Sequence, residues 1–148
     1  MNTQKFVRNA FTLVMLAATS VNAAQAGMVV YKDPYCTCCE AWAEALKSAG
    51  VALRVEIVED MDALKASYAV PQDVQSCHTA VADGYVFEGH VPLEAVRKVL
   101  GERPQIAGVA VPGMPAGALG MGDDASASYD VVAIGKDGHQ SVYMQVRP

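Results

Sequence analysis

The stretch of sequence that decides the fold runs from Met28 to Cys39 and reads MVVYKDPYCTCC. Residues 28–32 are apolar and rich in β-branched side chains, which predicts a short buried strand. Asp33-Pro34-Tyr35 breaks that strand, and a helical pattern follows over residues 38–49, with Gly50 after its last turn. Cys36, Cys38 and Cys39 therefore stand where a strand leads into the start of a helix.

The rest of the chain continues the alternation of strands and helices. We expect a strand over 51–58, a helix over 61–68, a hairpin of strands 79–82 and 85–88 around Asp83-Gly84, and a helix over 92–100 followed by Gly101. Residues 106–111 are predicted to be another strand or an extended stretch. Residues 112–128 are predicted to form a loop rich in glycine, and 129–134 with 140–146 to close the chain as a hairpin. This order predicts a thioredoxin-like α/β fold, a central mixed sheet flanked by helices.

The first 26 residues have the pattern of a secretory signal peptide. Lys5 and Arg8 precede an apolar run over 10–18, and small residues offer a cut after Ala23 or after Ala26. The apolar run is shorter than the ~20 residues that a membrane-spanning helix needs, so we expect no membrane association after cleavage. Residues 27–148 are then expected to form one domain that is exported to a bacterial periplasm.

Composition narrows the classes of function. The 148 residues carry 11 Lys and Arg against 16 Asp and Glu, a formal net charge of -5, and nucleic-acid binding needs the opposite sign. Hydrophobic residues make up 52%, which is enough for a core without disulfide staples. The four cysteines are therefore expected to serve chemistry rather than architecture.

Thiols at a helix N-terminus ionise readily, because the unpaired backbone N–H groups there carry partial positive charge. We expect Cys36, Cys38 and Cys39 to be deprotonated or metal-bound near neutral pH. Thioredoxins carry a cis-proline loop that faces their cysteines, and here that position reads Ser76-Cys77-His78-Thr79, without proline. Cys77 and His78 are thus expected to face the cluster, and soft thiolates favour Cu(I).

Further candidate ligands are weighed against ordinary structural roles. Met114 and Met121 flank the glycine-rich loop, where the alternative is that each packs onto the core. His90 precedes a helix, where a capping or surface role competes with metal binding. His139 on a hairpin tip and Lys32 are predicted to be solvated, and Trp42 is predicted to lie in the core beneath the site.

Four ordered motifs carry a resemblance to a known family. They are residues 30–39 (VYKDPYCTCC), 76–81 (SCHTAV), 83–92 with DGYV and EGHVP, and 111–115 (VPGMP). Together they resemble the bacterial family of small periplasmic metal-binding proteins, of domain-of-unknown-function type, typified by the copper-resistance protein CopG. The family usually reads GMPxGSPGM where this chain reads GMPAGALGM over 113–121, which weakens Met121 as a ligand relative to Met114.

The resemblance implies a thioredoxin-like fold, a copper–thiolate site for several ions, and a role in copper tolerance. Cys36, Cys38, Cys39 and Cys77 would supply the sulfurs, with His78 and Met114 as neighbours or ligands. Copper ions, and other periplasmic copper-handling proteins, would be the partners. Zinc ranks behind copper, because the adjacent Cys38 and Cys39 diverge and suit bridged metals better than one tetrahedral ion.

Two alternatives stay open. The sequence also does not decide whether the protein turns over as an enzyme, through a copper redox cycle between Cu(I) and Cu(II) or through thiol–disulfide chemistry. Cys36 and Cys39 have the C-x-x-C spacing of a periplasmic thiol–disulfide oxidoreductase. The cysteines could also serve a purely structural zinc ion or a Cys36–Cys39 disulfide.

Overall fold

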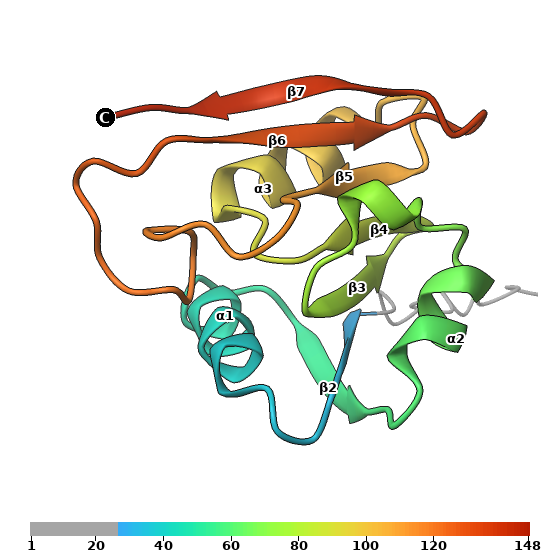
Figure 1. Ribbon diagram of the computed structural model, residues 1–148, viewed down its shortest axis with the longest axis horizontal. Coiled ribbons are helices and arrows are strands. Elements are labelled where there is room, and N and C mark those ends of the chain that lie inside the picture. The colour runs from blue at the N-terminus through green and yellow to red at the C-terminus, as the bar shows by residue number, and fades with distance from the viewer. Residues whose placement is uncertain (1–26) are drawn as a thin grey trace, which may run out of the picture.

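The computed structural model describes residues 27–148 (Figure 1). The predicted signal peptide, residues 1–26, lies outside the described residues. The elements are β1 (Met28–Lys32), α1 (Thr37–Ser48), β2 (Leu53–Ile57), α2 (Met61–Ser67), the 3-10 turn η1 (Gln72–Val74), β3 (His78–Ala82), β4 (Tyr85–Glu88), α3 (Leu93–Glu102), β5 (Gly108–Ala110), β6 (Tyr129–Ile134) and β7 (Gln140–Val146). Strand, helix, strand, helix, hairpin and helix follow in the expected order.

The strands form one mixed sheet in the order β2-β1-β3-β4-β5-β6-β7. β1 pairs parallel with β2 and antiparallel with β3, and β4 pairs parallel with β5. The closing hairpin β6–β7 extends the sheet at the β5 edge instead of standing apart from it (Figure 1). The chain is therefore an α/β protein built on a seven-stranded sheet with three α-helices.

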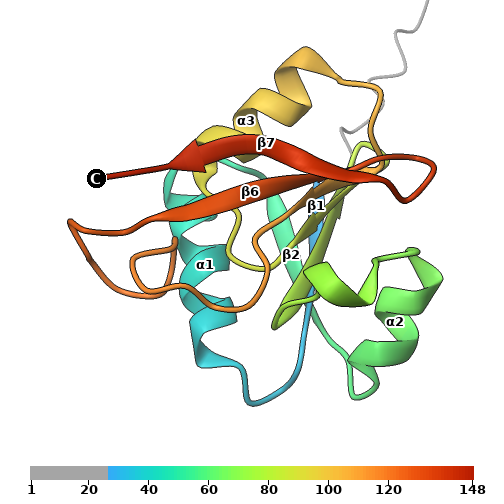
Figure 2. The ribbon, with the colours of Figure 1, turned by 45° about the horizontal axis from the view of Figure 1, so that its top comes forward.

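Alternate strand residues divide the core into two clusters, because successive side chains point to opposite faces of a sheet. The larger cluster joins Trp42 and Leu46 of α1 and Val96 of α3 to strand residues such as Phe87 and Val109. The smaller one gathers Val70, Val74, Val86, Ala110 and Ile134. In Figure 2, α1 and α3 lie on one side of the central strands and α2 on the other.

One predicted helix end is wrong. Gly101 was expected to follow the last helix, yet it lies inside α3, which ends at Glu102. Arg103 takes the left-handed conformation after the helix (φ 51°), a role that glycine usually fills. No helix in residues 27–148 is long and apolar enough to cross a membrane.

Candidate metal centre

Three of the four cysteines stand at the start of α1. Cys36 is the residue that caps the helix, and Cys38 and Cys39 lie in its first turn. The Cys36 side chain makes no capping hydrogen bond, so the free N–H groups of the first turn, with their partial positive charge, lie beside the thiols. Cys39 is buried, whereas Cys36 and Cys38 are half-buried.

Cys36 and Cys39 are joined by a disulfide, while Cys38 and Cys77 are free thiols. The expectation that Cys36 and Cys39 are deprotonated or metal-bound therefore does not hold in this disulfide state of the molecule. The physical reason is their spacing, since a three-residue step at a helix start places the two Cα atoms 5.4 Å apart, within reach of a disulfide. The Cys38 sulfur lies 3.5 Å from that of Cys36.

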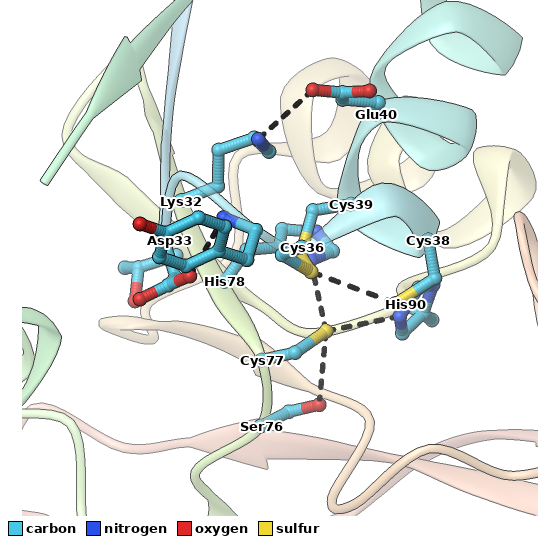
Figure 3. The surroundings of a disulfide bond; sticks show 12 residues. Lys32, Asp33, Cys36, Cys38, Cys39, Glu40, Ser76, Cys77, His78 and His90 are labelled. Carbon is cyan, nitrogen blue, oxygen red and sulfur yellow. Dashed lines mark hydrogen bonds and ion pairs between the residues drawn. A yellow bond between two sulfur atoms is a disulfide. The ribbon is translucent and has the colours of Figure 1, made fainter.

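Cys77 faces this cluster, as the sequence predicts. It stands just before β3, and β3 pairs with β1, the strand that leads into the cysteine helix. The Sγ atoms of Cys36, Cys38, Cys39 and Cys77 all lie within 4.8 Å of one another (Figure 3). Burial raises the pKa of the Cys77 thiol to about 11, and the nearby Cys38 adds to the increase. Without a metal, Cys77 is therefore a protonated thiol at neutral pH.

His90 lies against Cys77 and is fully buried. Its Nδ1 is 2.8 Å from the carbonyl oxygen of Leu119, which can only accept, so Nδ1 carries the proton and donates. The neutral ring then presents its Nε2 lone pair to the Cys77 sulfur, 3.0 Å away (Figure 3). Burial lowers the pKa of His90 and so favours the neutral ring, in which Nε2 carries no proton. A backbone carbonyl on the far nitrogen is one of the usual arrangements for a metal-bound histidine.

His78 completes a second group with Cys77 and His90, whose candidate ligand atoms also lie within 4.8 Å of one another. Its Nδ1 is 3.4 Å from the Cys77 sulfur, and its buried Nε2 has no hydrogen-bond partner among the described residues. Burial lowers the pKa of His78 to about 3, and His90 and Lys65 push it in the same direction. His78 is therefore neutral and able to donate a lone pair.

Trp42 and Lys32 support the site from the core. Trp42 is fully buried, its ring centroid lies 4.5 Å from that of His78, and its Nε1 donates to the Val91 carbonyl at 2.8 Å. The prediction of a solvated Lys32 is wrong. Its side chain is buried and its Nζ pairs with Glu40 of α1 at 3.0 Å, because Lys32 points to the same side of the sheet as the helix.

The glycine-rich loop docks beside the cysteines at three points. Ser76 Oγ donates to the Gly113 carbonyl, the Leu119 carbonyl accepts from His90, and Gly120 lies against the backbone of Cys38 and Trp42. Met114 is 55% exposed, so the alternative that it packs onto the core does not hold. Met121 is half-buried at the other end of the loop. His139 is exposed, as predicted.

A buried ion pair that the sequence analysis did not predict lies close to Cys77. Lys65 of α2 and Glu88 of β4 meet at 2.5 Å, and Glu88 Oε1 also accepts the backbone N–H of Ser76 at 2.7 Å. Burial raises the pKa of Glu88, while Lys65 acts against that change. A glutamate at the end of an otherwise apolar run, YVFE over 85–88, was the one available signal.

Comparison with known proteins identifies the family of this chain. The family described as "Protein of unknown function, DUF411" matches residues 74–121, which include Cys77, both buried histidines and the first part of the loop. No curated protein matches the chain. Two solved structures, "Copper resistance protein copG" in Form 1 and Form 2, align with TM-scores of 0.76 at 38% identity. The alignments cover 82% and 80% of this chain and 97% and 96% of those chains, so this protein belongs to the family of the copper resistance protein CopG.

Proposed function

We propose that the mature chain is a periplasmic copper-binding protein that holds Cu(I), as several ions, in its cysteine cluster. The observation that carries the proposal is the meeting of four cysteine sulfurs within 4.8 Å. Soft thiolates select Cu(I) over harder divalent ions, and sulfurs this close together can each bridge two metals. Zinc fits this site less well, because structural zinc sites place four separate ligands around one ion.

The histidines and methionines extend the same donor set. His90 offers Nε2 beside the Cys77 sulfur, and neutral His78 offers a buried nitrogen without another partner in the described chain. We propose both as ligands or close neighbours of copper. Exposed Met114 and half-buried Met121 sit on the docked loop and would supply thioether sulfur, with Met114 the better candidate.

Full use of the site requires reduction of the Cys36–Cys39 disulfide. Two electrons and two protons from a dithiol reductant convert the disulfide to two thiols, and copper then displaces the thiol protons. In the disulfide state only Cys38 and Cys77 remain as free thiols. Copper capacity should therefore depend on the redox state of the protein.

We further propose that β1 to α3 form a thioredoxin-like unit. The order β1-α1-β2-α2-β3-β4-α3, the strand order β2-β1-β3-β4 and the cysteines at the start of α1 support this assignment. Ser76-Cys77 then occupies the position of the thioredoxin cis-proline, and no peptide bond of the described chain is cis.

Export and copper tolerance complete the proposal. The signal-like residues 1–26 support a periplasmic location, and the similarity to a protein named for copper resistance supports a role in copper homeostasis alongside other copper-handling proteins. N-terminal sequencing of protein from a periplasmic extract should find a start at Ala24 or Gly27. A chain that retains Met1 would refute the export step.

Anaerobic titration of the reduced protein with Cu(I) tests the binding site. More than one copper should bind per chain, with a thiolate-to-copper absorption band in the near ultraviolet. The double variant Cys38→Ala, Cys39→Ala should lose most of this binding. Absence of the band, or undiminished binding in the double variant, would reject the proposal.

A second candidate function is thiol–disulfide exchange, favoured by the disulfide itself. The Cys36–Cys39 pair has C-x-x-C spacing at a helix start, and the free Cys38 sulfur lies 3.5 Å from Cys36. An insulin-reduction assay with metal-free protein decides between the two. Substantial turnover that a Cys36→Ser change abolishes would favour the oxidoreductase.

A further inference from the structure

A buried polar network lies next to the cysteine site on residues that the copper chemistry does not use. Glu88 at the end of β4 and Lys65 in α2 are both buried, and their charged atoms meet at 2.5 Å. Thr79 of β3 donates to Glu88 Oε2 at 2.6 Å and accepts from Lys65 at 3.0 Å. Three elements are thus joined through one carboxylate.

The same carboxylate holds the backbone next to Cys77. Glu88 Oε1 accepts the N–H of Ser76 at 2.7 Å, and Ser76 lies before β3, outside the regular strand pairing. The neighbouring Gly89 keeps this approach open, because an added Cβ there would lie 2.5 Å from the Ser76 side chain. Ser76 Oγ also donates to the Gly113 carbonyl, next to Met114.

A buried ion pair is poor evidence of a device for stability, because desolvation of the two charges offsets their attraction. This pair does have a geometric consequence, since Glu88 anchors the Gln75–Ser76 peptide in the short segment between η1 and Cys77. Charge-assisted bonds to a backbone N–H are short and directional. Through Ser76, Glu88 therefore restrains both the Cys77 sulfur and the start of the loop that carries Met114.

We propose that Glu88, held by Lys65, is a positioning residue that sets where the Cys77 sulfur stands in the copper site. The expected effect on copper affinity rests on the proposed copper function, whereas the restraint on Cys77 exists in the metal-free chain as well. Groups that orient metal ligands typically contribute about 10- to 100-fold in metal affinity.

The test compares Glu88→Ala with Glu88→Gln in the reduced protein. Both variants lose the charge that pairs with Lys65, but glutamine keeps an oxygen for the Ser76 N–H. Glutamine should therefore bind Cu(I) more tightly than alanine in a chelator competition. Alanine should weaken Cu(I) binding by about 10- to 100-fold. In metal-free protein, alanine should also speed alkylation of Cys77 several-fold, read by peptide mass spectrometry, because the released Ser76–Cys77 segment exposes the thiol.

A core variant controls for general loss of stability. Val99→Ala removes buried side-chain volume from α3 in the hydrophobic cluster. It should lower the melting temperature without changing Cu(I) affinity or the Cys77 alkylation rate. If Glu88→Ala behaves like Val99→Ala in both readouts, or if Glu88→Gln fails as badly as alanine, the positioning role is wrong.

A second pair of variants covers the case in which Glu88→Ala does not fold. Ser76→Pro removes the N–H itself, and Gln75 already has the extended backbone that a residue before proline needs (φ -66°, ψ 147°). Ser76→Ala keeps the N–H and loses only the hydroxyl. Ser76→Pro should weaken Cu(I) binding and speed Cys77 alkylation relative to Ser76→Ala, and equal behaviour would overturn the proposal. If wild-type protein binds no Cu(I), the copper function fails, and the alkylation rates alone decide the positioning role.

Discussion

The contact between Gly120 and α1 is open to a test with a built-in control. Gly120 has a φ of 85°, and an added Cβ would lie 2.7 Å from the Trp42 backbone N and 3.0 Å from the Cys38 carbonyl oxygen. Gly122, two residues later, has a φ of 87° and nothing within 4 Å of the same position. Gly120→Ala and Gly122→Ala thus impose the same backbone cost, and only the first also collides with the cysteine helix.

The expected loss of stability follows from the backbone cost and from the collision with α1. A left-handed alanine costs about 1–2 kcal/mol, so Gly122→Ala should lower the free energy of unfolding by that amount. Contact with fixed backbone atoms adds about 1–3 kcal/mol of overpacking, so Gly120→Ala should cost about 2–5 kcal/mol. Relief of the collision moves the loop away from α1, which strains the bond from His90 to the Leu119 carbonyl, one residue earlier.

Urea unfolding of the reduced, metal-free protein measures the difference, provided that the m-values of the two variants agree. Cu(I) competition on the same samples should show weaker binding for Gly120→Ala and wild-type binding for Gly122→Ala. Equal losses of stability in the two variants would refute the argument, because they would show that the loop does not rest on the helix.

Four further outcomes follow from the site. Protein with the Cys36–Cys39 disulfide intact should bind at most half the copper of reduced protein, measured by metal analysis, since two of four sulfurs are blocked; equal loading would contradict this. Alkylation of Cys77 in metal-free protein should stay slow at neutral pH and rise towards pH 11, because burial raises its pKa to about 11; a plateau by pH 9 would show a thiolate instead. Burial lowers the pKa of His78 to about 3, against 6.5 for the free side chain, so below pH 6.5 the unfolded chain binds more protons than the folded one. The free energy of unfolding should therefore fall on acidification, by about 1.4 kcal/mol per pH unit for one proton. His78→Gln should flatten this slope in denaturant titrations of metal-free protein. Trp42→Phe removes the donor to the Val91 carbonyl and should cost about 1–3 kcal/mol in the same titrations, and a neutral change would mean that the carbonyl finds another donor.

Local sequence patterns were sufficient for the order of elements. A β-branched run, a proline break and a helical stripe predicted β1 and α1, and the cysteines fell at their junction because the break is local. The end of α3 was missed because a non-glycine residue, Arg103, takes the left-handed position that the prediction assigned to Gly101. The contribution of β6 and β7 to the same sheet depends on pairing with β5 across the irregular loop of residues 111–128, and no local pattern encodes that pairing.

The sequence by itself determined which residues could carry soft-metal chemistry, because the chemistry of a side chain and its distance from a helix start can both be read along the chain. The clustered cysteines, the solitary Cys77 and the glycine-rich loop all belong to that part. Only the tertiary structure decided that Lys32 is buried, that His90 donates to the Leu119 carbonyl and that Glu88 accepts the N–H of Ser76. Each of those facts arises from contacts between strands, helices and a loop, and the protonation, burial and hydrogen-bond partners of a residue exist only after these segments pack together.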